Sequence, residues 1–268
     1  MIEILKSVIE KYESREQKIH HFRESLQILI LKIIYDCGFF RDLSFVGGTA
    51  LRILYDLRRF SEDLDFSLTQ KKVFDFTEFS QSLQRRLRQY GLIVEVKEKT
   101  EANVKNLIIR FPEILYSLGL SPLKGQKALI KVEIDINPPS GWRNEISLVN
   151  KIWLFSVTHF DLASLFATKI HACFFRKYVK GRDFYDLIWY FSKKVIPNFK
   201  LLNNGITQTE GKNPNLGREN FKHFLREQIE KTDFSLVRKD VERFLVDKNE
   251  VKLLKKELIL KSGNYLWQ

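Results

Sequence analysis

The sequence predicts an α/β (α+β) protein in which a part built from strands and helices precedes a helical part. Three observations support this prediction. A strand, a glycine turn and a helix follow one another near residue 45, strand-like alternation continues to Ile136, and helical periodicity dominates from His159 to the C-terminus. The sequence changes character after Pro138-Pro139. We therefore expect two domains, residues 1–150 and residues 151–268.

The elements of the first part follow from hydrophobic periodicity and from turn residues. Apolar residues recur at helical spacing from Ile2 to about Cys37, which predicts one long helix or two helices. Glycine and proline indicate where later elements end. In order, we expect a strand at Leu43–Val46, a helix at Thr49–Leu57, a strand at Leu64–Leu68, a basic amphipathic helix at Phe74–Tyr90 capped by Gly91, strands at Leu92–Lys97 and Val104–Phe111, a loop at Pro112–Gln126 and a strand at Ala128–Ile136.

The second part is expected to be helical with one polar interruption. Thr158-His159-Phe160-Asp161 resembles a capping box that starts a helix running through Lys169. The segment Asn203–Asn220 is rich in Asn, Gly, Thr and Pro, which predicts a long exposed loop.

Charge and cysteine content narrow the class of protein. Forty-five Lys and Arg residues against 33 Asp and Glu residues give a net charge of +12, which favours an anionic macromolecular partner such as RNA over a small neutral metabolite. The positive charge clusters at Arg85–Arg88 and Lys177–Arg182, although a basic cytosolic protein is the simpler alternative. The two cysteines, Cys37 and Cys173, provide neither a disulfide framework nor a cysteine-based zinc site.

The predicted location is the cytoplasm, with no membrane partner. The N-terminus lacks the regions of a signal peptide. The longest apolar run, Ile28–Tyr35, contains Lys32 and is far shorter than the ~20 residues that cross a bilayer. The protein is therefore expected to be soluble.

A candidate phosphate site lies at the turn Gly47-Gly48-Thr49, between a predicted strand and a predicted helix. The first backbone N–H groups of a helix have no partner within it and bind anions well. The hydroxyl of Thr49 can add a donor. The alternative interpretation is a tight turn in which Thr49 is only the helix N-cap.

Two aspartates indicate a metal site. Asp63 and Asp65 are two positions apart, so on a strand both carboxylates project from one face. Like charges at this separation repel, and a divalent cation reverses that repulsion. Oxygen ligands favour Mg²⁺ or Mn²⁺. About a dozen residues separate them from the glycine turn, enough for one helix and a return, so both are expected to meet at one end of the sheet.

A third carboxylate comes from the predicted strand Lys131–Ile136, where Glu133 and Asp135 share a face. An edge strand with a solvated charged face explains this pattern equally well in isolation. Next to the other two features, Asp135 is the better candidate. Its carboxylate can complete a metal shell or accept the proton of an attacking hydroxyl.

In the second part, Lys169 lies in an otherwise apolar stretch, where a lysine often only extends its charged end to solvent. Asp183 and Asp186 are three apart and share a helical face. Either aspartate can pair with Lys169 or act as an N-terminal helix charge. His171 is expected to be a packed core histidine.

Four motifs in order closely resemble those of the AbiEii/AbiGii-type nucleotidyltransferase toxins, a family of the DNA polymerase beta-like nucleotidyltransferase superfamily. The resemblance covers roughly residues 40–190. The motifs are Gly-Gly-Thr-Ala-Leu at 47–51, Arg-Phe-Ser-Glu-Asp-Leu-Asp-Phe at 59–66, Ala-Thr-Lys-Ile-His-Ala at 167–172 and Gly-Arg-Asp-Phe-Tyr-Asp-Leu at 181–187.

This resemblance implies a catalytic domain with a mixed sheet and a helical domain that closes over the nucleotide. It also implies the toxin of a type IV-like toxin–antitoxin pair that uses Mg²⁺ or Mn²⁺ to transfer NMP from an NTP to RNA, tRNA above all. By the family pattern, Gly47, Gly48 and Thr49 hold the triphosphate, Asp63 and Asp65 bind metal with Asp135 as a weaker match, Lys169 contacts phosphate, and Asp183 or the nearby Asp186 is the last functional aspartate.

Thr49 departs from the pattern, since superfamily members usually have a serine there, but the hydroxyl is retained. Two other functions remain open from the sequence. One is NMP transfer to a protein, and the other is a non-catalytic module that binds nucleic acid or an antitoxin.

Overall fold

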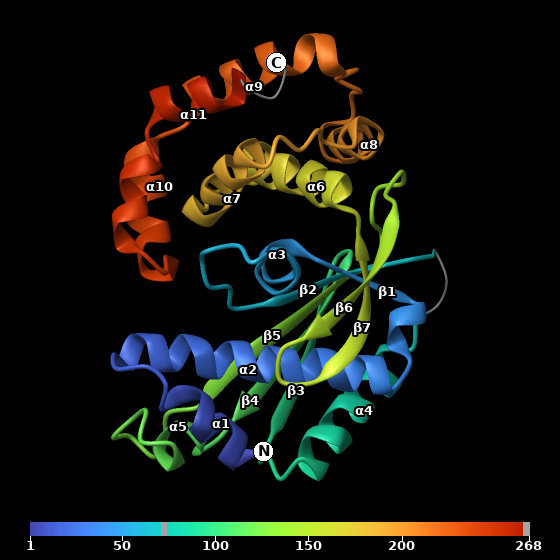
Figure 1. Cartoon of the computed structure of the whole chain (residues 1–268). Coiled ribbons are helices and arrows are strands. Elements are labelled where there is room, and N and C mark those ends of the chain that lie inside the picture. Colours follow the sequence, from blue (N-terminus) through green and yellow to red (C-terminus); the bar gives the residue numbers. More distant parts are fainter. Residues whose placement is uncertain (71–73, 265–268) are drawn as a thin grey trace. The chain divides into compact units, whose positions relative to one another are not determined.

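Two compact units make up the chain, and the computed structural model describes its residues 1–70 and 74–264 (Figure 1). The chain passes between the two units several times, so neither unit is one continuous stretch of sequence. Residue 150, the predicted domain boundary, lies within the first unit. The first, here called the sheet unit, contains Met1–Leu54, Ser61–Asn137 and Ile146–His159, and the second, the helical unit, contains Tyr55–Phe60, Pro138–Glu145 and Phe160–Gln268.

Within the described residues, seven strands form one sheet in the order β3-β4-β5-β2-β1-β7-β6. The sheet is mixed, because β2 is antiparallel to β1 and parallel to β5, and β1 is parallel to β7. This arrangement confirms the predicted α/β class with a mixed sheet. The strands are β1 (Leu43–Val46), β2 (Leu64–Leu68), β3 (Glu95–Glu101), β4 (Val104–Phe111), β5 (Ala128–Asp135), β6 (Asn144–Asn150) and β7 (Leu154–Phe160).

The predicted bounds of β1, β2 and β4 are confirmed, whereas β3 begins three residues later than expected. Strands β6 and β7 were not predicted. On β6, Ile146 and Leu148 are exposed and only Val149 is buried, so its apolar residues do not mark an inward face. The strand β7 ends at Phe160, and the next residue, Asp161, caps the following helix. No turn residue therefore marks the end of the strand in the sequence.

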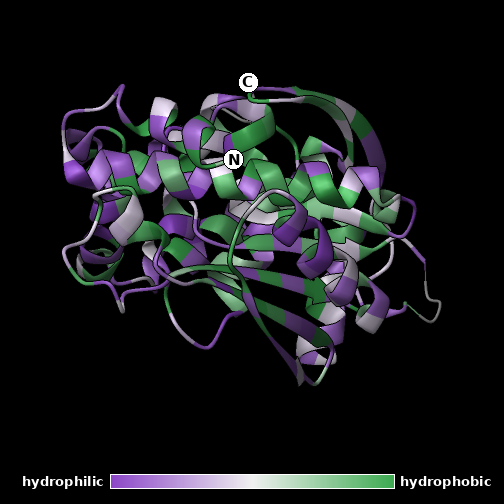
Figure 2. Cartoon of the chain, turned by 90° about the horizontal axis from the view of Figure 1, so that it is seen from below, coloured by the Kyte–Doolittle hydropathy of each residue, from purple (hydrophilic) through white to green (hydrophobic). Residues whose placement is uncertain are grey.

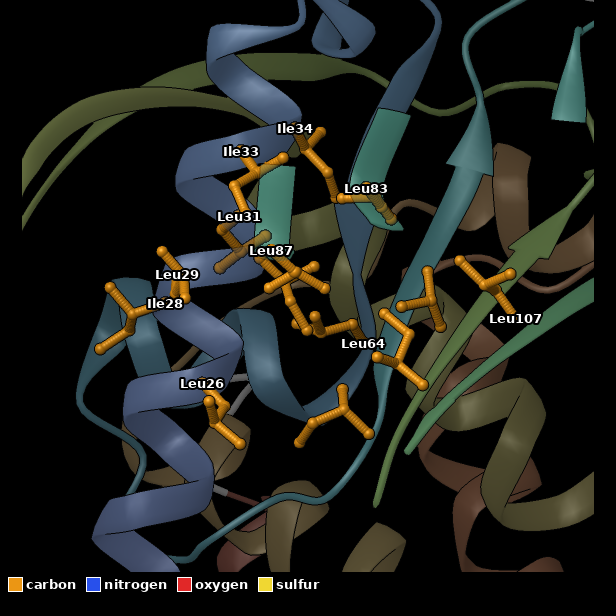
Figure 3. Packing of buried hydrophobic residues seen from close by; sticks show 14 of the residues in the cluster. Leu26, Ile28, Leu29, Leu31, Ile33, Ile34, Leu64, Leu83, Leu87 and Leu107 are labelled. Carbon is orange, nitrogen blue, oxygen red and sulfur yellow. The ribbon is translucent and has the colours of Figure 1, made fainter. Parts of the chain in front are cut away.

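The core of the sheet unit forms where helix α2 (Arg15–Asp36) packs beside the sheet. Leu26 and Leu29 of α2, Leu83 of helix α4 (Phe76–Gln89) and Leu64 of β2 belong to one apolar cluster (Figure 3). Burial of each such side chain stabilises the fold by about 1.5–3 kcal/mol. Hydrophobic and hydrophilic residues alternate along the strands, as expected for a sheet with differing faces (Figure 2).

The predicted helices of the sheet unit are present with small shifts. The N-terminal region forms two helices, separated where Ser14 caps α2 by accepting a hydrogen bond from the backbone N–H of Gln17. Gly91 follows α4 with φ +77°, as expected of a C-terminal cap. The remaining helices are α1 (Ile2–Ile9), η1 (Phe39–Arg41), α3 (Gly47–Tyr55) and α5 (Ile114–Ser117), the last lying inside the predicted loop Pro112–Gln126.

The helical unit contains the expected second set of helices. Asp161 starts α6, because its side chain accepts a hydrogen bond from the backbone N–H of Ser164 at 2.7 Å. No helix in the described part of the chain is long and apolar enough to cross a bilayer. Residues 265–268 of the predicted helical part lie outside the described residues. The helices are α6 (Leu162–Phe175), α7 (Gly181–Ser192), α8 (Phe199–Glu210), α9 (Arg218–Glu230), α10 (Phe234–Val241), η2 (Glu242–Phe244), η3 (Lys248–Leu253) and α11 (Lys256–Asn264).

The predicted loop Asn203–Asn220 is wrong at both ends, because residues 203–210 are helical in α8 and residues 218–220 begin α9. Leu202 and Ile206 are buried at helical spacing, and this burial offsets the weak helix propensity of the neighbouring Asn, Gly and Thr residues. The side chain of Asn203 bonds both backbone groups of Leu216, at 2.8 and 2.9 Å, and so holds the short connection that follows.

Candidate active site

The glycine turn lies where β1 ends and α3 begins. Gly47 has φ +78°, a conformation that residues with a Cβ atom rarely adopt. A Cβ atom at this position would also overlap the carboxylate of Asp65, which therefore lies against the backbone of the turn. The structure brings the glycine turn and one of the two predicted metal-binding aspartates into direct contact.

Thr49 joins the same two segments. It is fully buried in the first turn of α3, and its hydroxyl donates a hydrogen bond to the backbone carbonyl of Asp63. The hydroxyl thus fixes the start of the aspartate strand to the glycine turn. The backbone N–H of Thr49 lies in the first turn of the helix.

Strand register places the carboxylates along one face of the sheet. Asp65 lies opposite Val46 of β1 and beside Glu133 of β5, while Ser67 lies beside Asp135. Asp65, Glu133 and Asp135 therefore project from the same face, with Asp135 two residues further along β5 than Glu133.

Lys131 adds a positive charge to this face. Its Nζ lies 2.6 Å from a carboxylate oxygen of Glu133. Burial alone would lower the pKa of Lys131, but Glu133, together with Asp63, raises it. The lysine thus neutralises Glu133, which leaves Asp135 as the better third carboxylate on β5.

Asp135 is half-buried, and its Oδ1 accepts a hydrogen bond from the backbone N–H of Asn137 at 2.9 Å. Burial raises the pKa of this carboxyl above its usual value, and the hydrogen bond offsets only part of that rise. A carboxyl group with a raised pKa holds a proton more readily than an exposed one.

Among residues 1–70 and 74–264, no group of three or more His, Cys, Asp or Glu side chains is arranged to hold a metal ion. The three carboxylates of Asp63, Asp65 and Asp135 are therefore not gathered into one ready-made cage. Protein sites for Mg²⁺ commonly use one or two carboxylates together with substrate phosphates. Two aspartates beside a glycine turn that begins a helix fit that kind of site.

The helical unit contains a second cluster of charges, centred on Lys169. Its Nζ lies 2.7 Å from Oδ1 of Asp183 and 2.8 Å from Oδ2 of Asp186. Lys169 is only 8% exposed, so its amine does not extend into solvent. Lys169 therefore pairs with both Asp183 and Asp186, the two partners that the sequence left open.

Two arginines complete this cluster. Arg59, which is 2% exposed, donates two hydrogen bonds of 2.6 Å from its guanidinium to the carboxylate of Asp186, which is fully buried. Arg176 donates one of 2.9 Å to Oδ2 of Asp183. Three cations thus surround two carboxylates.

The charges in this cluster stabilise one another. Burial alone would lower the pKa of Lys169, but the carboxylates of Asp183 and Asp186 raise it. Burial alone would raise the pKa of Asp183, yet Lys169 and Arg176 hold it below its usual value. Lys169 and Asp183 are therefore both charged at neutral pH.

Arg59 received no role from the sequence, although it begins the second motif. It belongs to the segment Tyr55–Phe60, which folds as part of the helical unit. The backbone N–H of Phe60 donates to the carbonyl of Phe244 at 2.8 Å, and Arg58 forms an ion pair with Glu250 at 3.2 Å. The need for a second cation could have indicated Arg59, because two buried carboxylates on α7 require more positive charge than Lys169 alone supplies.

Comparison with known proteins agrees with this geometry. A family model described as "Nucleotidyl transferase AbiEii toxin, Type IV TA system" matches residues 29–255. No curated protein matches the chain.

Two crystal structures share the fold. One is described as a nucleotidyltransferase from H. pylori (18% identity, TM-score 0.55), and the match covers 91% of this chain and 93% of that one. The other is JHP933 from Helicobacter pylori (19% identity, TM-score 0.55), with 91% and 90% covered. Because the family model covers most of its residues, the chain belongs to the AbiEii family, the nucleotidyl transferase toxins of type IV toxin–antitoxin systems, and is a transferase enzyme with an NTP substrate and an antitoxin partner.

Proposed function

We propose that this enzyme transfers NMP from an NTP to an RNA acceptor, with tRNA as the acceptor class. The contact between Gly47 and Asp65 is the observation that supports it most directly. It joins a phosphate-binding turn to a carboxylate that binds hard cations, and a nucleoside triphosphate complexed with Mg²⁺ needs both.

In this proposal, the backbone N–H groups of Gly47, Gly48 and Thr49 bind the triphosphate. Asp63 and Asp65 would hold Mg²⁺ or Mn²⁺. When bound, the ion neutralises negative charge on the phosphates. The hydrogen bond from Thr49 to the carbonyl of Asp63 keeps the turn and the aspartates in register.

The transfer step uses the hydroxyl of the acceptor as nucleophile. Its oxygen forms a bond to the α-phosphorus while the bond from that phosphorus to the bridging oxygen breaks, and pyrophosphate leaves with that oxygen. Asp135 accepts the proton of the hydroxyl or serves as a further metal ligand. Its raised pKa supports the first role, because a proton acceptor must hold the proton that it takes.

Lys169 and Asp183 are the proposed contribution of the helical unit. Lys169 offsets negative charge on the triphosphate, as the family pattern implies. Asp186 is fully buried and held by both Arg59 and Lys169, whereas Asp183 contacts the partly exposed Arg176. This difference favours Asp183 as the functional aspartate and Asp186 as the anchor of the cluster.

The RNA acceptor is inferred from the net charge of +12 and from two basic segments, α4 and Lys177–Arg182. Arg85, Arg86 and Arg88 are exposed on α4. Such side chains neutralise phosphates and release counterions, so binding is expected to weaken steeply as salt rises.

A labelling experiment tests the proposal. The purified protein is incubated with Mg²⁺, total tRNA and each of the four α-labelled NTPs, and gels separate RNA from protein. The inactive control is the double variant Asp63→Ala, Asp65→Ala, and Glu62→Gln is the matched control next to the site.

Label on tRNA from one NTP, absent only in the double variant, is the expected result and identifies the nucleotide. Label on protein alone would replace the RNA acceptor with a protein acceptor. Absence of label on either would favour the non-catalytic binding module.

A further inference from the structure

The short loop of residues 176–180, which joins α6 to α7, presents an aromatic ring to solvent. Tyr178 is 60% exposed, and Val179 beside it is also exposed. Two cations lie near the tyrosine ring, with the guanidinium carbon of Arg176 5.5 Å and Nζ of Lys180 5.7 Å from its centroid. A large exposed ring flanked by cations contributes little to the fold, since it buries little apolar area.

Both ends of this loop are fixed. At its start, Arg176 is bonded to the buried carboxylate of Asp183. At its end, the backbone N–H of Gly181 donates to Oδ2 of Asp240 at 2.8 Å, and a Cβ atom on Gly181 would overlap the carbonyl of Val237. Tyr178 is therefore presented on a short loop with anchored ends, which lowers the entropy lost when a ligand binds.

The charge around the ring is positive. Residues 176–182 contain four basic residues and no acidic one. Arg182 packs over the ring of Phe244, with 4.1 Å between its guanidinium carbon and the centroid. Lys177 has no ion-pair partner within the described part of the chain, so its amine is available to an external anion.

We propose that this loop binds an unpaired nucleotide of the RNA acceptor, with the base stacked on Tyr178 and the adjacent phosphates contacted by Lys177 and Lys180. The inference rests on the proposed RNA acceptor and specifies which part of the RNA is bound. Aromatic rings flanked by cations bind single strands, because every unpaired base has a face to stack. In a duplex the bases stack on each other and cannot reach such a ring.

Tyr116 of α5 provides a matched control, because it is 51% exposed and has no cation over its ring among the described residues. The full-length protein is titrated into a fluorescein-labelled single-stranded oligoribonucleotide and, separately, into a duplex RNA of equal phosphate number. Fluorescence anisotropy gives the dissociation constants for wild type, Tyr178→Ala, Tyr178→Phe, Tyr116→Ala and Lys177→Ala.

We expect Tyr178→Ala to weaken single-strand binding about 5- to 150-fold, the range for losing one stacked base. Tyr178→Phe should bind like wild type, because it keeps the ring. The Lys177→Ala variant should lower the slope of log affinity against log salt by about 0.7. Equal affinity of wild type and Tyr178→Ala, or an equal loss in Tyr116→Ala, would overturn the proposal, as would equal effects on duplex RNA.

The binding assay needs no NTP, so it separates this inference from the proposed reaction. If the protein labels no RNA but its RNA binding depends on Tyr178, the loop is supported as a binding site and the transfer to RNA is rejected. Transfer to tRNA with an unchanged KM for tRNA in Tyr178→Ala would support the reaction and reject the loop as a binding site.

Discussion

Two pairs of aspartates, one in each unit, have different surroundings although both occur in family motifs. Asp183 and Asp186 of the helical unit are buried within hydrogen-bonding distance of three cationic side chains. Asp63 and Asp65 of the sheet unit are half-buried, and Asp65 lies against the backbone of the glycine turn. The first pair is neutralised by cationic side chains of its own unit, whereas we propose that the second pair binds an external cation.

The largest expected effect that tests this difference between the aspartate pairs is the loss of NMP transfer in a variant of Asp65. Replacing Asp65 by Asn should lower NMP transfer at least about a thousandfold, because the variant loses the charge that holds the cation at the phosphates. The free energy of unfolding should fall by less than in Asp186→Asn, since Asp65 is half-buried whereas Asp186 is fully buried. Transfer assays and urea unfolding measure the two quantities, with Glu62→Gln as the control. Retained activity would reject the metal role of Asp65.

The opposite pattern is expected for the helical unit, where Asp186→Asn should destabilise the protein by about 3–5 kcal/mol. The substitution leaves the guanidinium of Arg59 buried without its charge partner and leaves the amine of Lys169 with Asp183 alone. Urea unfolding checks the value. A loss below about 1 kcal/mol would show that the cluster does not stabilise the fold.

Glu24 of the sheet unit tests whether ion pairing makes a carboxylate stabilising, whichever unit contains it. Burial alone would raise the pKa of Glu24, but hydrogen bonds from His21 and Arg52 lower it from 4.5 to about 2. A lowered pKa in the folded state means stability that is present above pH 4.5 and is lost as the pH falls through about 2. The shift corresponds to about 3 kcal/mol.

Unfolding curves measured between pH 6 and pH 2 should therefore show wild type losing more stability than Glu24→Gln. Parallel curves for the two proteins would contradict the assignment.

The smallest expected effect concerns the glycine turn. Alanine at Gly47 has a strained φ and a Cβ that overlaps Asp65, whereas alanine at Gly91 has nearly the same φ of +77° and open space around its Cβ. Strain alone should cost about 1–2 kcal/mol in each variant. Only Gly47→Ala should also reduce transfer, because it displaces Asp65. Equal activity of the two variants would mean that the contact is not used.

Much of the sheet unit was predictable because its buried strands are short apolar runs bounded by turn residues. Leu43–Val46 and Leu64–Leu68 have this pattern, and glycine conformation explains the turn at Gly47. The edge strand β6 has an exposed apolar face, and α8 is helical through buried contacts, so local patterns failed for both.

The candidate site was predictable only as a set of residue types. Asp63, Asp65 and the glycine turn were found from spacing, but spacing cannot show that the hydroxyl of Thr49 bonds to the Asp63 carbonyl. Nor can it show that Arg59 lies against Asp186, which is 127 residues away in the sequence. Such long-range pairs depend on how the units fold and not on any local pattern.

The most direct test of the central claim is Mn²⁺ binding, measured by electron paramagnetic resonance in the presence of a non-hydrolysable NTP analogue. Wild type and Glu62→Gln should bind the ion with the same affinity, and the double variant Asp63→Asn, Asp65→Asn should lose that binding while its unfolding curve stays unchanged. Undiminished Mn²⁺ binding by the folded double variant would contradict the assignment of these two aspartates to the metal and nucleotide.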